Sequence, residues 1–416
     1  MIQRPRGTQD FPPEQMAKRR FVENSMRVTF KSFGYSEVQT PTFEHLELFT
    51  AKSGEGIIDE LYAFKDKGGR DLALRPELTA PVIRMYVEKL QMDPKPLKFF
   101  YFGNCFRYDR PQKGRYREFM QAGCELIGCD SPAALAELVA LAWVLLKNVG
   151  LKNIVLRIGN LDFISRVLDD LDIKEGVRKK LFPFIDKKQF DELEVFMGNE
   201  GFSGEQISSL LGFLKCSDVD EVKGFVNDDN LIKPFEEMLS LLPMFGIEKY
   251  MVDTSIVRGL DYYKGMVFEI EAPALGAEKQ LCGGGVYDLV PLFGGKQVST
   301  AGFAVGFDRT VVALENEGYS FPEERLKAYV VPIDNDSLPY ALKVTMECRG
   351  LKIPVDVDLT GRSIAKSLKY ANSRKAENVV IVGERERETK TVTVKNMETG
   401  EQKNVTIGEL LKVLKG

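Results

Sequence analysis

Residues 107–125 read RYDRPQKGRYREFMQAGCE, a basic stretch that runs into a strand-like segment. The aromatic segment 98–106 precedes it, and a second strand candidate covers 118–127. This order predicts a long antiparallel hairpin with a polar tip. Because side chains alternate along a strand, Phe119, Gln121 and Glu125 are expected on one face, with Arg107 over that face.

The hairpin carries the groups that a nucleotide needs. Guanidinium groups bind phosphate, and an aromatic plane can stack on a purine. A solvated basic turn on an ordinary hairpin is the alternative that these residues alone leave open. Two further segments favour the binding interpretation. Residues 74–80 (LRPELTA) place an acid and a hydroxyl where an ammonium group could bind, and 302–309 (GFAVGFDR) place an arginine in the first turn of a helix, where a bound anion would explain it.

The rest of the chain suggests two or three domains in 416 residues. A helix is expected over 14–33 and another from Ser131 to Asn148, and strand signals return at 250–257, 264–272, 278–283 and 300–306. Residues from 326 onward alternate between strand and helix. The predicted fold is an α+β catalytic domain built on an antiparallel sheet, with a helical insertion, plus a C-terminal α/β domain with a mixed sheet. The predicted domain boundaries are 1–160 with 246–325, 161–245, and 326–416.

The net charge of −4 is unevenly distributed. Residues 326–416 contain 16 basic and 12 acidic residues, a net charge of +4. Residues 161–245 contain 10 basic and 18 acidic residues, a net charge of −8. Such asymmetry can steer a polyanion to one part of a molecule, although chance variation between domains is an alternative.

Composition excludes several classes of protein. The single histidine, His45, rules out a metal site built from two histidines and a mechanism with two imidazoles. The six cysteines form no CxxC pair, which argues against structural zinc and disulfides and favours a reduced, cytoplasmic setting. No run of 18 apolar residues indicates a membrane span, and the N-terminus does not read as a signal peptide.

Taken together, these segments resemble a known family. Residues 107–125 and 302–309 resemble motifs 2 and 3 of the class II aminoacyl-tRNA synthetases, and 14–41 resemble motif 1. Four further stretches are similar to segments of the histidyl-tRNA synthetases. Residues 6–11 (RGTQDF) resemble the N-terminal segment of that family, and 258–263 (RGLDYY) and 282–288 (CGGGVYD) resemble its two signature motifs. Residues 361–371 (GRSIAKSLKYA) resemble its anticodon-binding domain.

The resemblance implies an ATP-dependent, AMP-forming histidine–tRNA ligase. Such an enzyme makes histidyl-adenylate and pyrophosphate from L-histidine and ATP, then transfers histidine to the 3′ end of tRNA(His). The attacking carboxylate is already ionised, so the enzyme positions reactants and neutralises charge. Mg²⁺ would escort the outer phosphates, and the chain would form a cytoplasmic homodimer through motif 1.

The resemblance also implies roles for individual residues, without assigning a metal ligand. Arg107 and Arg258 would be the catalytic residues. ATP would be bound by Arg107, Asp109, Arg115, Phe119 and Arg309. Histidine would be bound by Glu77, Thr79, Gln121, Glu125, Arg258, Tyr263 and Tyr287. Two positions depart from the family pattern: Asp109 stands where glutamate is usual, and Val286 stands where many members carry arginine.

Two related classes are the alternatives. The histidine-binding regulatory subunit of ATP phosphoribosyltransferase resembles these synthetases, but such paralogues lack the C-terminal domain and lose ATP-binding arginines. This chain has residues 326–416 and retains Arg107, Arg115, Arg258 and Arg309. A prolyl or threonyl enzyme is disfavoured by the two signature motifs and by Glu125.

Overall fold

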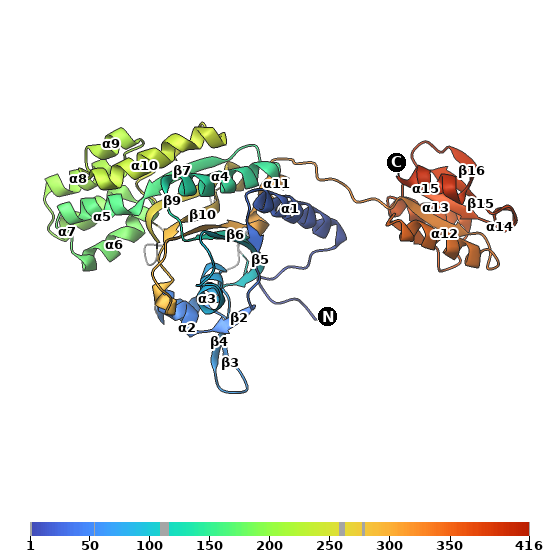
Figure 1. Cartoon of the computed structure of the whole chain (residues 1–416), viewed down its shortest axis with the longest axis horizontal. Helices are drawn as coiled ribbons and strands as arrows, with labels where there is room; N and C mark the ends of the chain where they lie inside the picture. Colours follow the sequence, from blue (N-terminus) through green and yellow to red (C-terminus); the bar gives the residue numbers. More distant parts are fainter. Residues whose placement is uncertain (1, 54, 109–115, 258–262, 277–278, 416) are drawn as a thin grey trace. The chain divides into compact units, whose positions relative to one another are not determined.

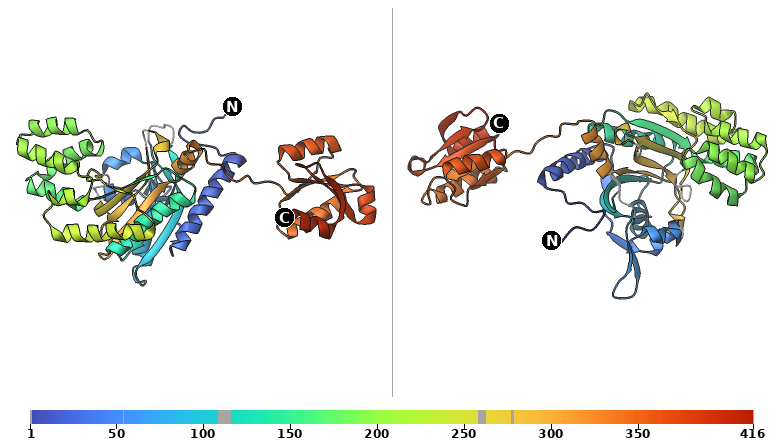
Figure 2. Two further views of the ribbon diagram at one scale, coloured as in Figure 1. Left: turned by 90° about the horizontal axis from the view of Figure 1, so that it is seen from above. Right: turned by 180° about the vertical axis from the view of Figure 1, so that it is seen from behind.

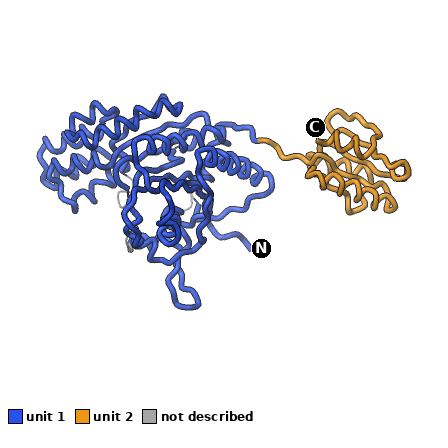
Figure 3. The backbone as a smooth tube through the Cα atoms, in the orientation of Figure 1, with its two compact units in different colours: residues 1–321 blue, residues 322–416 orange. Residues whose placement is uncertain are grey.

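The chain folds into two compact units, residues 1–321 and 322–416 (Figure 3). The computed structural model describes residues 2–53, 55–108, 116–257, 263–276 and 279–415. The finer division of the first unit into a catalytic domain and a helical insertion stays a prediction.

An eight-stranded sheet organises the first unit. Its strands follow the spatial order β1 (Ser36–Glu37), β5 (Leu97–Phe106), β6 (Glu118–Ile127), β11 (Thr300–Gly306), β10 (Gln280–Tyr287), β9 (Tyr263–Glu271), β7 (Val155–Asn160) and β8 (Met251–Val252). Every neighbouring pair is antiparallel except the two edge pairs, β1 with β5 and β7 with β8. The predicted antiparallel sheet is confirmed, and the expected hairpin is its β5–β6 pair.

Helices pack on both faces of this sheet. Helices α1 (Pro13–Ser32) and α4 (Pro132–Asn148) lie along one face (Figures 1 and 2). They share one apolar core with β5, β6 and β11, in which Phe30 stacks on Phe100 with ring centroids 4.9 Å apart. Ser131 caps α4 by accepting the Ala134 N–H. Helix α3 (Thr79–Lys89) packs over the opposite face, and α11 (Phe307–Asn316) continues directly from β11.

A small three-stranded sheet was not predicted. It consists of β2 (Phe43–His45), β4 (Asp71–Leu74) and β3 (Ala63–Lys65). The short helices α2 (Glu47–Ser53) and η1 (Glu55–Glu60) connect β2 to β3 in the chain and contribute to the same small apolar core. The β3–β4 hairpin projects away from the body of the unit (Figure 1). Its strands are too short to show a period-two pattern in sequence. His45 lies at the end of β2 and is exposed.

Residues 161–245 form helices, as expected. They are α5 (Leu161–Asp170), α6 (Glu175–Asp186), α7 (Phe190–Asn199), α8 (Gly204–Leu214), α9 (Val219–Lys223), α10 (Asp229–Leu241) and η2 (Leu242–Phe245). The strand expected over 250–257 is wrong beyond Val252, because the buried Asp253 carboxylate accepts hydrogen bonds from the Ser255 backbone, from Arg157 of β7 and from Lys188. These bonds fold the segment into a turn that joins the helices to the sheet.

The second unit has the mixed sheet that its pattern predicts. Its strands follow the order β13 (Val355–Val357), β12 (Ala328–Pro332), β14 (Asn378–Val382), β15 (Thr391–Asn396) and β16 (Gln402–Thr406), with the first two pairs parallel and the others antiparallel. Its helices are α12 (Leu338–Gly350), α13 (Ile364–Ser373), α14 (Glu384–Thr389) and α15 (Ile407–Lys415). The sequence pattern did not reveal β16 or α14, which are short and highly polar.

In the described ranges, no helix has both the length and the apolar character needed to cross a membrane.

Candidate active site

A cross-strand row places Glu125 at the centre of the large sheet. Glu125 of β6 pairs with Phe99 of β5 and with Gly302 of β11, and Gly302 in turn pairs with Gly285 of β10. Residues in one row share a face, so this row lies on the face that bears α3. The next residue along β6, Cys124, points into the opposite core against α1 and α4.

Two tyrosines hold the Glu125 carboxylate. Tyr101 of β5 donates to Oε1 at 2.8 Å, and the Tyr287 hydroxyl of β10 donates to Oε2. Glu125 has no exposed surface, and both tyrosines are buried. Gly302 makes room for this arrangement, because a Cβ at that position would lie 2.0 Å from Oε2.

The environment of Glu125 changes its acidity. Burial raises the pKa of its carboxyl to about 8, and hydrogen bonds from Tyr287, Tyr101 and Thr79 only partly oppose that effect. A carboxyl with a pKa near neutral can give or take a proton in exchange with an imidazole, whose own pKa is about 6.5.

The raised pKa predicts a pH-dependent difference in stability between the wild type and Glu125→Gln. Between the ordinary value of 4.5 and the folded value of about 8, the folded chain keeps a proton that the unfolded chain has lost. The free energy of unfolding therefore falls as pH rises through this window, and the glutamine variant lacks this contribution. We expect the Tm of Glu125→Gln relative to wild type to increase from pH 5 to pH 9 in thermal melts. A constant difference would contradict the assignment.

Residues from α3 and β9 surround Glu125. The Glu77 carboxylate accepts the Thr79 N–H at 2.5 Å and the Ala80 N–H at 3.2 Å, which anchors it at the first turn of α3. The Thr79 hydroxyl lies 3.5 Å from the Tyr101 hydroxyl. Tyr263 meets Tyr287 edge to face, with ring centroids 6.2 Å apart. A carboxylate accepts hydrogen bonds, which is the chemistry that an ammonium group requires.

The residues expected to bind ATP line the same face farther along the hairpin. The Arg107 guanidinium lies over the Phe119 ring, 5.3 Å from its centroid, and its Nε donates to the Pro76 carbonyl at 3.0 Å. The Cys105 thiol donates to Oε1 of Gln121 at 3.3 Å, which orients that amide. The hairpin thus brings the aromatic ring, the guanidinium and the amide to one side, as expected from strand alternation.

Arg309 reaches this region from the start of α11. Its side chain folds over Gly306, and a Cβ on Gly306 would lie 3.2 Å from the arginine Cδ. Gly306 pairs with Gln121, so Arg309 lies next to the hairpin. The preceding residue, Asp308, is buried and accepts the Met120 N–H at 2.6 Å as well as a hydrogen bond from Arg19 of α1.

Three expected site residues, Asp109, Arg115 and Arg258, lie outside the described residues. In the part of the chain that the structure describes, no group of three or more His, Cys, Asp or Glu side chains could hold a metal ion.

Sequence reasoning missed Tyr101, Gly302 as a space-making residue, and Asp308. Tyr101 sits in an aromatic run, KFFYFGNCF, in which nothing distinguishes a site residue from core. Because side chains alternate along a strand, Tyr101 lies on the same face as Cys105, four residues later, and this alternation is the signal that could have placed it at the site.

This antiparallel sheet, its motif 2 hairpin and the arginine in the first turn of α11 define a class II aminoacyl-tRNA synthetase. The family model "Histidyl-tRNA synthetase" matches residues 7–310, and "Anticodon binding domain" matches 327–416. The histidine–tRNA ligase of Methanosarcina acetivorans is 46% identical over 418 residues, covering 100% of this chain and 99% of the relative. The chain belongs to the histidyl-tRNA synthetase family.

Solved structures agree with this membership. The apo histidyl-tRNA synthetase of S. aureus matches with a TM-score of 0.78 and 32% identity, covering all of both chains. A Bacillus halodurans structure described as an ATP phosphoribosyltransferase regulatory subunit/histidyl-tRNA synthetase has a TM-score of 0.81, covering 92% of this chain and 98% of that one. At 24% identity it shows the shared fold alone. The full-length match to a ligase and the matched anticodon-binding domain disfavour the regulatory-subunit alternative.

Proposed function

We propose a residue-level mechanism for the histidine–tRNA ligase reaction to which family membership assigns this chain. The observation that carries it is the buried Glu125 between Tyr101 and Tyr287, a site built to pair with a polar ring. The Glu125 carboxyl pairs with one imidazole nitrogen, and Tyr263 with the other. A side chain that could not make these bonds would leave buried polar groups unpaired, which can supply about 10⁴–10⁵-fold discrimination.

The α-amino group and ATP take the flanking positions. Glu77, Thr79 and Gln121 receive the ammonium, which directs the substrate carboxylate toward the hairpin. ATP enters as its Mg²⁺ complex. Phe119 stacks on adenine, Arg107 and Arg258 neutralise the α-phosphate, and Arg115 and Arg309 hold the terminal phosphate. Asp109 is assigned to the same ATP-binding group, and Tyr287 both holds Glu125 and lines the histidine site.

The first step then proceeds without a general base. The ionised histidine carboxylate attacks the α-phosphorus, the bond to the bridging oxygen breaks, and pyrophosphate leaves. The charge that develops on the phosphate oxygens is neutralised by the arginines, which is the main catalytic contribution. In the second step, the terminal adenosine hydroxyl of the tRNA attacks the carbonyl carbon of the adenylate, the bond from that carbon to the AMP oxygen breaks, and AMP and the hydroxyl proton are released.

Histidine-dependent exchange of labelled pyrophosphate into ATP tests this proposal. Exchange with histidine, and not with proline or threonine, is the expected result. Absence of exchange with histidine would overturn the proposed function, and exchange with another amino acid would transfer it to a sister family.

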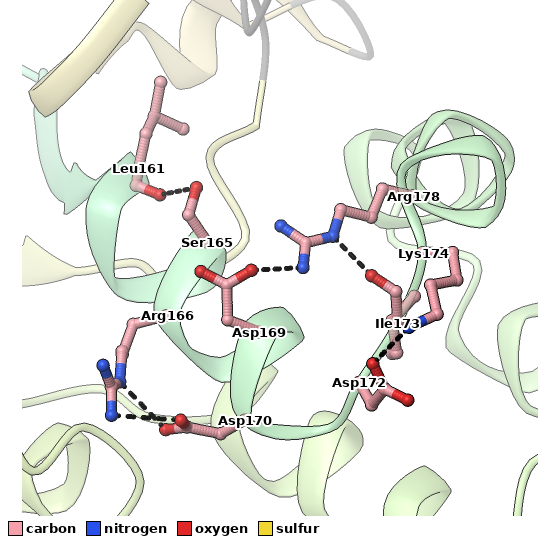
Figure 4. Close-up of polar contacts among 9 residues, drawn as sticks. All are labelled: Leu161, Ser165, Arg166, Asp169, Asp170, Asp172, Ile173, Lys174 and Arg178. Atoms are coloured by element: carbon pink, nitrogen blue, oxygen red, sulfur yellow. Dashed lines mark hydrogen bonds and ion pairs between the residues drawn. The ribbon is translucent and has the colours of Figure 1, made fainter.

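The second unit is proposed to bind the tRNA. It carries the positive net charge, and its α13 presents Lys366 and Lys369 at exposed positions. The helices of 161–245 are less suited to broad phosphate contact, since eight of their ten basic residues form ion pairs in this fully described segment. Figure 4 shows three of these pairs: Arg166–Asp170, Lys174–Asp172 and Arg178–Asp169.

Deleting residues 322–416 should therefore weaken tRNA binding. We expect a loss of at least about ten-fold in affinity and a shallower dependence of log K on log salt, because fewer phosphates are neutralised. Filter binding across a salt series measures both quantities, and retained pyrophosphate exchange shows that the first unit is intact. Unchanged affinity would contradict the assignment of this unit.

A cytoplasmic homodimer completes the proposal. The edge strand β1 exposes both of its residues, and Val28 of the neighbouring α1 is 69% exposed. An open strand edge beside an apolar helix position is a surface suited to a second copy. Sedimentation equilibrium measures the assembly.

A further inference from the structure

The N-terminal segment that resembles its family counterpart has no role in the mechanism above. Residues 5–8 form a tight turn, in which the Thr8 hydroxyl donates to the Pro5 carbonyl at 2.8 Å. Gly7 has φ +88°, a conformation that side chains disfavour. The segment 5–8 is called the N-terminal turn below.

Backbone hydrogen bonds connect this turn to Arg107. The Arg117 N–H donates to the Gly7 carbonyl at 2.8 Å, and the Arg107 N–H donates to the Arg117 carbonyl at 2.9 Å. Gly7 is thus hydrogen-bonded to Arg117, and Arg117 is hydrogen-bonded to Arg107 on the other strand of the hairpin. The Arg117 side chain also packs directly against Gly7, because a Cβ added to Gly7 would lie 2.7 Å from Cγ of Arg117.

The other side of the hairpin stem is held as well. The Tyr108 N–H donates to the Glu60 carbonyl at 2.8 Å, and its ring packs against Tyr62 with centroids 5.4 Å apart. The Arg117 guanidinium covers the Tyr108 ring at 4.0 Å. The stem therefore lies between the N-terminal turn and the end of η1, and two segments distant in sequence fix its position.

We propose that the N-terminal turn positions the hairpin stem, and through it Arg107, for ATP. The inference rests on the proposed role of Arg107 at the ATP phosphates. Gly7 and Arg117 act as positioning residues, since they reach the substrate only through their neighbour. A guanidinium must be placed closely to stabilise a transferring phosphate, and a displacement of about 1 Å can cost about 100-fold in rate.

Gly7→Ala tests the turn, and Gly201→Ala is its matched control. Gly201 has the same φ of +88° but nothing within 4 Å of an added Cβ, and it lies in the helical segment. In pyrophosphate exchange, we expect Gly7→Ala to raise the KM for ATP about ten-fold and to leave the KM for histidine within about two-fold. Gly201→Ala should carry the same backbone strain without the kinetic effect.

Two further variants separate positioning from general damage. Thr8→Val removes the hydroxyl that donates to the Pro5 carbonyl and keeps the backbone hydrogen bond between the same two residues. It should therefore raise the KM for ATP by a smaller factor than Gly7→Ala. Arg117→Ala combined with Gly7→Ala should show less than additive loss, because the two changes disturb one contact.

The outcomes distinguish this inference from the proposed function. If Gly7→Ala raises both KM values alike, or behaves as Gly201→Ala does, the positioning role is overturned. If the wild type shows no exchange with histidine, the proposed function fails instead. Calorimetric titration with MgATP then still tests the role of the turn. The positioning role predicts weaker MgATP binding in Gly7→Ala than in Gly201→Ala, and equal binding would overturn it.

Discussion

Replacing Glu125 with alanine should lower kcat/KM for histidine about 1,000-fold, since removing one partner of a buried hydrogen-bonded pair costs about 2–5 kcal/mol. The alanine variant loses the group that pairs with the imidazole. It also leaves the hydroxyls of Tyr101 and Tyr287 without their acceptor. Glu125→Gln keeps the shape and one acceptor, so its loss should be about ten- to one-hundred-fold.

Steady-state pyrophosphate exchange, measured at varied concentrations of histidine and of ATP, gives kcat and the KM for each substrate. The KM for ATP should stay near its wild-type value in Glu125→Gln, because Arg107 and Phe119 are supported by other contacts. Equal increases in both KM values would show that the substitution disturbs the sheet, and an unchanged KM for histidine would remove Glu125 from the site.

Adding one methyl group at Gly302 should damage histidine binding almost as severely. The new Cβ would lie 2.0 Å from Oε2 of Glu125 and 2.4 Å from the Cys124 carbonyl. The carboxylate must then leave its place between the tyrosines, or β11 must move away from β6. We expect Gly302→Ala to lower kcat/KM for histidine about 100-fold, the size of effect that a small misplacement produces.

Gly284→Ala is the matched control for this variant. Its Cβ would lie 2.4 Å from the Gly302 carbonyl oxygen and from Cβ of Phe303, so it strains β11 against β10, as Gly302→Ala strains β11 against β6. Gly284 points to the opposite face, away from Glu125. Thermal melts should show that both variants lose stability, while only Gly302→Ala raises the KM for histidine at temperatures where both are folded. Similar KM values in the two variants would contradict the space-making role of Gly302.

The local signals in the sequence were strong where one element carries the whole pattern. The hairpin 98–127 was predictable because its strands are long and its tip is basic. The terminal unit was predictable because strand and helix alternate over nearly its full length. The turn at Asp253 was not predictable, since its conformation depends on Arg157 and Lys188, which lie far away in the chain.

The sequence by itself determined the family, the antiparallel hairpin, the face shared by Phe119, Gln121 and Glu125, and the residues that carry charge. These features depend on residue type and on alternation along one strand. Only the tertiary structure decided that Tyr101 and Tyr287 clamp Glu125, that Gly302 leaves room for it, and that Gly7 supports the hairpin stem. The physical reason is that each of these contacts joins strands or segments whose register is set by the packing of the whole sheet, which no local pattern encodes.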